Sequence, residues 1–317
     1  MLELRFFGVG QASYAGRPLP GFPHQQPYLL IIYLLLNPEQ VHSREQLAAL
    51  FWGDYPTATS RKYLRNALWR ARHLLESVGA PADTYLRVYD EGVGFGQVGP
   101  YTLDVEIFEQ ITNRHRAVTG RDLLPDQAAE LERAVQLYTG ELLSDVYEDW
   151  CLYERERLNL IHLDALGKLV VFHELNGTYE RGLEYARRIL AYDDTREKVH
   201  RRMMRLYWLA GDRGAALAQY KLCAQILQDT LGVAPMAETR QLYEQMAHGD
   251  FVSPGRIMRQ GSPAPVLLAG STGPWLQMEQ ALLRVEELQH TIQQANTELG
   301  QLHRLLSQAI GESRMPR

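Results

Sequence analysis

Residues 60–76 read SRKYLRNALWRARHLLE, and this stretch decides how the first third of the chain is interpreted. No acidic residue precedes Glu76 in it, although five cations lie within twelve residues: Arg61, Lys62, Arg65, Arg70 and Arg72. At 100° per residue, one arc of a helix collects the apolar side chains. These are Leu64, Ala67, Leu68, Ala71, Leu74 and Leu75. The stretch therefore predicts a helix with one buried face.

The opposite face combines cations, an amide and an aromatic ring. It holds Lys62, Asn66, Trp69 and His73, flanked by Arg65 and Arg70. Cations attract phosphate and release counterions, and Arg and Asn pair with guanine and adenine edges. A solvated face on a packed helix is the alternative. Trp69 favours DNA binding, because a large exposed aromatic ring is unfavourable unless something covers it.

The surrounding elements favour a winged helix. Two short strands within residues 1–18 precede an apolar helix at Pro27–Leu36. Ser43 and Gln46 have the spacing of a capping box for a second helix, REQLAALFW. Thr59 or Ser60 is predicted to cap the basic helix, which ends near Ser77. Two strands around a glycine-rich turn follow in YLRVYDEGVGFGQV, and three helices followed by a hairpin are typical of a winged helix-turn-helix.

This arrangement predicts which residues contact DNA. The basic helix lies in the major groove, and the capped start of the second helix meets a phosphate. The wing tip, Glu91–Gly96, is predicted to touch the minor groove or the backbone. The predicted DNA-binding residues are Ser43, Arg44, Arg61, Lys62, Arg65, Asn66, Trp69, Arg70, His73 and Arg87.

From Asp104 onward the pattern is helical. The predicted helices span 104–118, 125–140, 147–176, 179–192, 196–210, 213–229 and 236–247. GTYERGLEYA from Gly177 aligns with GDRGAALAQY from Gly211, an offset of 34 residues. That period is typical of tetratricopeptide helix pairs, which need a small residue at Gly182 and Ala216 for close approach. Aromatic residues on these helices are predicted to be mostly core, with a ligand-binding groove as the alternative: Tyr179, Tyr185, Tyr192, Tyr207, Trp208 and Tyr220.

A proline- and glycine-rich stretch separates the last segment. Residues 252–274 are predicted to be a linker. Apolar residues then recur at two heptad positions over residues 275–310, which predicts a coiled coil. Its partner is another copy, giving a homo-oligomer, or a helix of another protein. Packing back onto its own domain is the alternative.

Charge and composition exclude several classes of protein. The net charge is −5, and residues 1–100 carry 9 Lys and Arg against 8 Asp and Glu, so DNA contact needs a local patch. Cys151 and Cys223 have no CxxC partner, and no HExxH spacing or GxxxxGK[ST] loop occurs. We therefore expect no metal, no cofactor and no enzyme activity. Glu154, Glu156 and Asp164 alternate with Arg155 and Arg157 as in a surface of ion pairs. The apolar run at Tyr28–Leu36 is too short to span a bilayer, so no membrane partner is expected.

The chain resembles the SARP family of bacterial activators over residues 1–250. The resemblance rests on HSREQLAALFWGD, SRKYLRNALWRARHLLE, TLDVEIFE, LYTGELLSDVYEDWCLYERERL, NGTYERGLEYARRILAYDD and GDRGAALAQYKLCAQILQDTLGVAP, in that order. It implies a cytoplasmic activator that binds direct repeats of double-stranded DNA and contacts RNA polymerase. It also implies an OmpR-type winged helix interlocked with a bacterial transcriptional activator (BTAD) domain.

The expected fold is mainly α with small β elements. A winged helix-turn-helix at residues 1–100 precedes an all-α tetratricopeptide-like, BTAD-like domain at 101–251, the linker at 252–274 and a C-terminal coiled-coil helix at 275–312. The expected function is sequence-specific transcriptional regulation. The alternatives are a protein-interaction scaffold with a degenerate winged helix, and a repressor in place of an activator.

Overall fold

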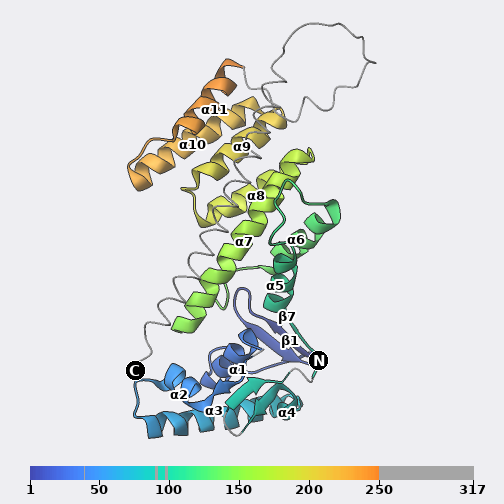
Figure 1. Ribbon diagram of the computed structural model, residues 1–317, viewed down its shortest axis with the longest axis vertical. Coiled ribbons are helices and arrows are strands. Elements are labelled where there is room, and N and C mark those ends of the chain that lie inside the picture. Colours follow the sequence, from blue (N-terminus) through green and yellow to red (C-terminus); the bar gives the residue numbers. More distant parts are fainter. Residues whose placement is uncertain (39, 90–91, 97–98, 250–317) are drawn as a thin grey trace, which may run out of the picture. The chain divides into compact units, whose positions relative to one another are not determined.

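The computed structural model describes residues 1–38, 40–89, 92–96 and 99–249, which lie in one compact unit (Figure 1). The predicted linker at 252–274 and coiled-coil helix at 275–312 lie outside the described residues. Among the described residues, no helix is both long and apolar enough to cross a membrane.

Two small sheets frame the N-terminal part. The first has the strand order β3-β2-β1-β7 and the second β4-β6-β5. Their strands are β1 (Leu2–Arg5), β2 (Gln11–Tyr14), β3 (Arg17–Pro18), β7 (Tyr101–Leu103), β4 (His42–Ser43), β5 (Leu86–Val88) and β6 (Gly92–Phe95). β1 pairs antiparallel with β2 and parallel with β7, so residues 101–103 complete a sheet that begins at residue 2.

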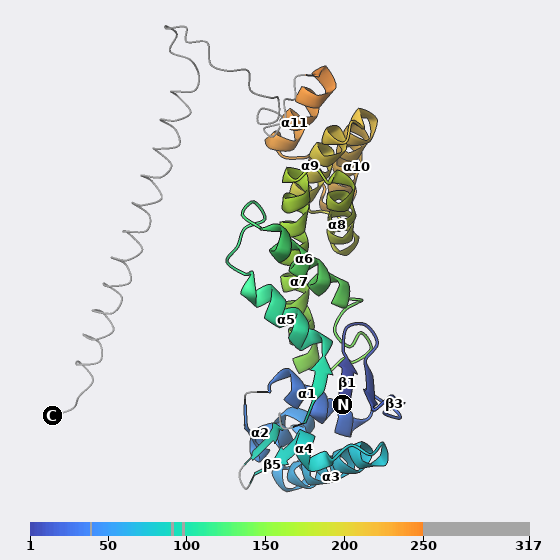
Figure 2. The ribbon, with the colours of Figure 1, turned by 90° about the vertical axis from the view of Figure 1, so that its right-hand side faces the viewer.

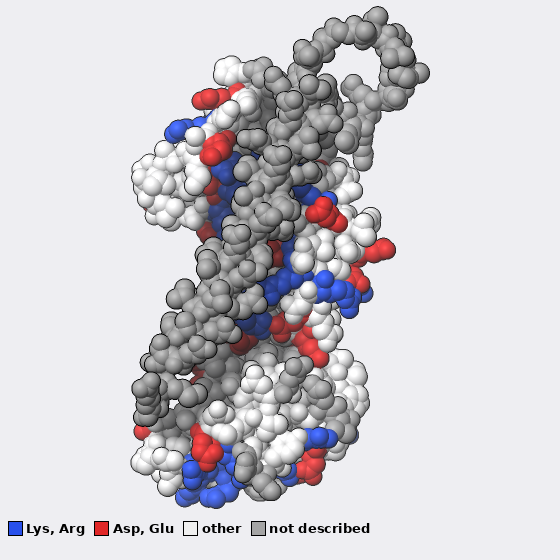
Figure 3. All heavy atoms as spheres, viewed as in Figure 1, with Lys and Arg blue, Asp and Glu red and all other residues white. Residues whose placement is uncertain are grey.

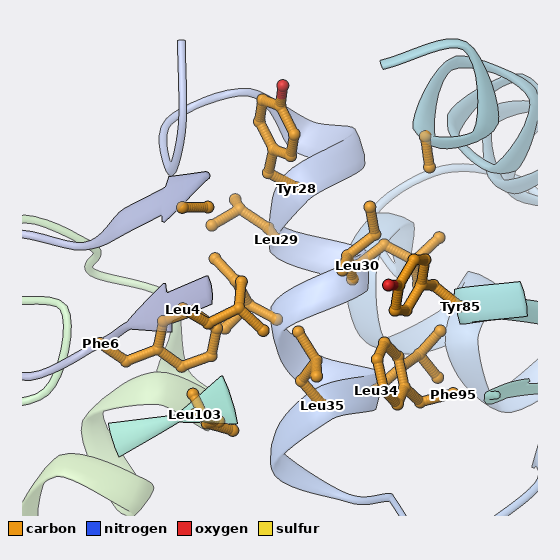
Figure 4. Close-up of a cluster of buried hydrophobic side chains, with 14 of the residues drawn as sticks. Leu4, Phe6, Tyr28, Leu29, Leu30, Leu34, Leu35, Tyr85, Phe95 and Leu103 are labelled. Atoms are coloured by element: carbon orange, nitrogen blue, oxygen red, sulfur yellow. The ribbon is translucent and has the colours of Figure 1, made fainter. Parts of the chain in front are cut away.

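Helix α1 (Gln26–Leu36) is the centre of the first core. Its apolar residues are buried on nearly every side, which explains the unbroken run in its sequence. In Figure 4, Leu29 and Leu35 point toward Leu4 and Leu103 of the first sheet, and the other side of α1 faces Tyr85 and Phe95. Helix α1 therefore joins the sheet to the winged-helix elements α2 (Arg44–Trp52), α3 (Thr57–Ser77) and α4 (Ala82–Tyr85).

The predicted start of the basic helix is wrong. Helix α3 begins at Thr57 after Pro56, so neither Thr59 nor Ser60 is its N-cap. Ser60 is buried, and its hydroxyl donates to the carbonyls of Trp52 (2.8 Å) and Tyr55 (3.1 Å). Ser60 therefore ties the α2–α3 turn to the first turn of α3.

The predicted wing tip is also wrong, because two of its glycines, Gly92 and Gly94, belong to a strand. Gly92–Phe95 form β6, which is buried and pairs with β5 and β4. A Cβ on Gly92 would lie 2.5 Å from Val41 Cγ1 and 2.9 Å from the His42 carbonyl oxygen. Glycine is needed here for close strand approach, not for a turn. Glu91 lies outside the described residues.

Between residue 104 and residue 249, the last that the structure describes, seven helices follow, close to the predicted ranges (Figure 2). They are α5 (Asp104–Arg114), α6 (Pro125–Leu137), α7 (Asp149–Leu175), α8 (Tyr179–Tyr192), α9 (Glu197–Leu209), α10 (Arg213–Leu231) and α11 (Ala237–His248). The two repeats are confirmed as helix pairs: Gly177 and Gly211 take positive φ angles of 76° and 90° before α8 and α10. A Cβ on Gly182 would lie 3.1 Å from Leu206 Cδ2, so α8 and α9 approach closely at that glycine.

The aromatic residues of these helices are less buried than predicted. Tyr185 is fully buried, whereas Tyr192 is exposed. The other four are half-buried: Tyr179, Tyr207, Trp208 and Tyr220.

The N-terminal part and the helical part share a core. Its buried residues run from Leu2 to Leu158 on α7. The carboxylate of Asp104, at the start of α5, accepts backbone N–H bonds from Phe6 (2.8 Å) and Phe7 (3.1 Å). Residues on both sides of the predicted boundary at residue 100 therefore pack together, and the boundary itself stays a prediction.

Candidate nucleic-acid interface

Helix α3 has the two predicted faces. Leu64, Ala67, Leu68, Ala71 and Leu75 are buried and Leu74 is half-buried. The predicted DNA-facing side chains of α3 are all exposed: Arg61, Lys62, Arg65, Asn66, Trp69, Arg70 and His73. Figure 3 shows Lys and Arg side chains gathered at the lower edge of the molecule, where α3 lies.

The cations of α3 divide into two groups. Arg61 Nη2 lies 3.1 Å from Glu45 Oε1 on α2, and Arg72 Nη2 lies 2.8 Å from Asp83 Oδ1 on α4. Lys62, Arg65 and Arg70 form no ion pair within the part of the chain that the structure describes. These three cations are therefore available to a phosphate or a base edge without breaking an internal contact.

The start of α2 is ordered by the predicted capping box. The Ser43 hydroxyl oxygen accepts the Gln46 backbone N–H (3.1 Å), and Gln46 Oε1 accepts the Ser43 N–H (3.2 Å). Arg44 donates from Nη2 to the carbonyl of Tyr89 at the end of the wing strand (3.1 Å). The cap and this bond fix the second helix beside the wing, so the guanidinium of Arg44 is positioned by both.

A hollow of about 450 Å³ lies between α2, α3 and β5. Its wall includes Arg44, Arg61, Arg65, Trp69, Arg72 and Val88. Trp69 is 59% exposed, and its ring packs at 4.0 Å, centroid to centroid, on the ring of His73. The structure therefore brings four of the predicted residues, Arg44, Arg61, Arg65 and Trp69, to one hollow. Arg87 on β5 is exposed beside it.

Sequence reasoning missed Val88 and the ion pairs to Glu45 and Asp83. Val88 follows Arg87 on β5 and is 36% exposed in the hollow. Strand alternation gives no signal for it, because Arg87 and Val88 are both exposed in β5. The two acids lie on other helices, so the α3 sequence carried no sign of them.

The described residues hold little that is typical of an active site. No group of three or more His, Cys, Asp or Glu side chains in them has the geometry to hold a metal ion. Both cysteines are buried, and burial raises the pKa of each thiol to about 11. Neither is a ready nucleophile, because the thiolate is the reactive form.

Comparison with known proteins identifies the helical part. Residues 103–246 match the family described as the bacterial transcriptional activator domain. The regulatory protein AfsR of Streptomyces coelicolor is 25% identical over 225 residues, which are 68% of this chain and 22% of AfsR. The transcriptional regulator RedD of the same organism is 26% identical over 232 residues, 70% of this chain and 64% of RedD. The chain thus spans less than two thirds of the length of either relative.

A solved structure supports the same fold for most of the chain. EmbR of Mycobacterium tuberculosis, in complex with a low-affinity phosphopeptide, superimposes with a TM-score of 0.64 at 19% identity. The match covers 81% of this chain and 67% of EmbR. Residues 103–246 therefore form a bacterial transcriptional activator domain, and the chain is similar over about two thirds of its length to SARP-type bacterial regulators of transcription.

Proposed function

We propose that this chain is a sequence-specific DNA-binding regulator of transcription, and that it acts without enzyme activity as an activator. The observation that carries the proposal is the outer face of α3. It presents Lys62, Arg65 and Arg70 without ion-pair partners among the described residues, around Asn66 and Trp69. An exposed face of this kind favours a polyanion with readable base edges.

The proposed contacts follow from the geometry. Arg65 and Asn66 lie on the central turns of α3 and read base edges in the major groove. Lys62 and Arg70 flank them and meet phosphates. Arg44 at the start of α2 and Arg87 on the wing position the protein on the backbone. Ser43 holds the cap that orients Arg44.

Contact with RNA polymerase and pairing of copies are further parts of the proposal. The family supports contact with the transcription machinery, and the two curated relatives are a regulatory protein and a transcriptional regulator. Residues 275–310 are proposed to bring copies or a partner helix together. Light scattering on a chain that lacks residues 275–310 tests this, because a lower mass is expected and an unchanged mass would contradict pairing between copies.

Selection from random duplex DNA tests the function directly. The full chain is incubated with the pool at about 150 mM salt, and bound duplexes are sequenced. We expect enrichment of a spaced direct repeat. The Arg65→Ala variant should enrich it less, whereas Arg157→Ala, which removes a cation from α7, should enrich it equally. A folded protein that enriches no sequence would favour the alternative, a protein-interaction scaffold. The small net charge of residues 1–100 is the observation that supports this alternative.

A further inference from the structure

A second hollow, of about 380 Å³, lies in the helical part, away from α3. Its wall is built from the loop after α6, the middle of α7 and the last turns of α8. The residues that matter are Tyr138, Glu141, Asn159, His162 and Arg188. The volume is within the usual range for small-molecule sites.

Three buried polar atoms at this hollow have no hydrogen-bond partner within the described part of the chain. They are the Tyr138 hydroxyl, Asn159 Nδ2 and His162 Nδ1. Asn159 is 3% exposed and His162 is 6% exposed. A buried polar group without a partner costs about 1–3 kcal/mol, so three at one hollow are a large deficit. All three residues line the hollow.

All three unpaired groups can donate a hydrogen bond. Burial, followed by the charge of Arg188, lowers the pKa of His162 to about 3, so its ring is neutral at pH 7. Arg188 Nη2 lies 3.4 Å from His162 Nε2, and a guanidinium can only donate. Nε2 is therefore the acceptor, and the ring proton is on Nδ1. The Asn159 amide nitrogen also donates, and the Tyr138 hydroxyl donates or accepts.

Charge adds to this preference. Arg188 places a guanidinium in the wall, oriented by its bond to the Val135 carbonyl (2.9 Å). Glu141 is in the same wall, with Oε2 3.8 Å from Arg155 Nε and half of its side chain exposed. A ligand that fits this hollow therefore places acceptor oxygens at the donors and at Arg188, and keeps any negative charge away from Glu141.

We propose that this hollow is a binding site for a small organic carboxylate. A carboxylate only accepts hydrogen bonds, so it satisfies Asn159, His162 and Tyr138 together, and it pairs with a guanidinium. The rings of Tyr138 and His162, which both line the hollow, stack on each other with centroids 4.0 Å apart and hold each other in place. An acid that also carries an amine gains a second contact at Glu141.

The site is placed to stabilise the junction with the N-terminal part. Thr139, in the same wall, donates to the Phe7 carbonyl (3.1 Å), and the Gly8 N–H donates to the Glu141 carbonyl (2.9 Å). The ring of Tyr138 packs 4.7 Å from that of Phe7. A ligand here therefore orders the loop to which the first sheet is bonded. The proposal is independent of DNA binding, because no residue of α3 is involved.

Calorimetry and thermal unfolding of the full chain at pH 7 test the site. The probes are benzoate, succinate, L-glutamate and L-phenylalanine, with benzamide and succinamide as uncharged controls. We expect at least one acid to bind with one-to-one stoichiometry and to raise Tm, while the amides do neither. Tighter binding of the amino acids than of the plain acids would assign a role to Glu141, and equal binding would limit the recognition to the carboxylate.

Substitutions in the wall of the hollow should weaken ligand binding without a matching loss of stability. Tyr138→Phe and Asn159→Leu should each weaken acid binding about tenfold, the loss of one hydrogen bond to a charged ligand. Tyr138→Phe should leave Tm of the free protein unchanged or higher, because the hydroxyl lacks a partner. Tyr207→Phe, outside the hollow, is the matched control and should bind as the parent does. No binding by any acid, equal binding by the amides, or wild-type affinity in Tyr138→Phe would overturn the proposal.

Discussion

Helices α3 and α7 both carry cations, but they use them differently. On α7, Arg155 donates to three backbone carbonyls, Arg157 pairs with Glu109 and Glu154, and Lys168 binds Asp164 and two carbonyls. On α3, Lys62, Arg65 and Arg70 meet no acid in the described part of the chain.

The difference separates cations that hold the fold from cations that await a partner. The charges of α7 join it to α5, to the α5–α6 connection and to the loop before α7, so the protein itself compensates them. The free cations of α3 stabilise nothing internally. Changes on α7 should therefore lower stability, and changes on α3 should lower DNA affinity while leaving stability unchanged.

The largest expected effect is that of Arg155→Ala. The Arg155 guanidinium, 12% exposed, bonds the carbonyls of Leu142 (2.9 Å), Leu143 (2.6 Å) and Val146 (2.8 Å). Leu143 has a positive φ of 43°, which a non-glycine residue holds only under constraint. The loss of these three hydrogen bonds should lower the unfolding free energy by about 3 kcal/mol, which urea denaturation measures.

Arg157→Ala is the control for that prediction. Arg157 is 43% exposed in its ion pair with Glu109. Its removal should cost less than about 1 kcal/mol, the usual value of an exposed pair. Equal losses for the two variants would remove the distinction between Arg155 and a surface cation.

Arg65→Ala should have the opposite profile. If Arg65 contacts a base, its removal should weaken binding to the selected duplex by about 1–3 kcal/mol. The unfolding free energy should change by less than about 0.5 kcal/mol, since the side chain is exposed. A gel shift at fixed salt checks the affinity, and unchanged affinity would mean that α3 does not read the site through Arg65.

Acid should destabilise the protein through His162 on α7. Unfolded His162 takes up a proton as the pH falls through about 6.5, whereas the buried ring, with its pKa at about 3, stays neutral. Its contribution is therefore complete above pH 6.5 and is lost progressively below it, by about 2 kcal/mol at pH 5. Between pH 7 and pH 5, the unfolding free energy of His162→Phe should therefore fall by that much less than the unfolding free energy of the parent, as measured by urea denaturation. The same pH dependence in both proteins would contradict the assignment.

The smallest effect concerns the cap of α2. Ser43→Ala removes the oxygen that accepts the Gln46 N–H and should cost about 1 kcal/mol, with Ser43→Gly costing a few tenths. Because Ser43 orients Arg44 and the cap is not itself a base contact, DNA affinity should fall less than threefold. Thermal unfolding and a gel shift on the same samples measure both. A tenfold fall would show that the cap, directly or through Arg44, contributes more to DNA binding than its role in ordering α2 explains.

The local sequence pattern was sufficient to predict the structure where a residue's environment is set by its own helix. The burial arc from Leu64 to Leu75, the Ser43–Gln46 box and the glycines before α8 and α10 were all readable from spacing. The DNA contacts assigned to the exposed residues stay predictions.

Pattern failed where contacts come from distant segments. Arg155 reads as a surface ion pair in sequence, yet the loop that ends at Val146 folds over it. Gly92 and Gly94 read as a turn, but Val41 and His42 pack against Gly92 and make a strand of it. Neither neighbour can be found from the local sequence.

The salt dependence of DNA binding tests the central claim most directly. The dissociation constant of the full chain for the selected duplex is measured from about 50 to 300 mM salt. The same is done for the variant with Lys62→Gln, Arg65→Gln and Arg70→Gln together, and for Arg157→Gln. Each phosphate contact contributes about 0.9 to the slope of log Kd against log salt. We expect the triple variant to lose between about one and three units of slope while remaining folded, and Arg157→Gln to keep the parent slope. A folded triple variant with the parent slope would show that α3 does not carry the DNA contact.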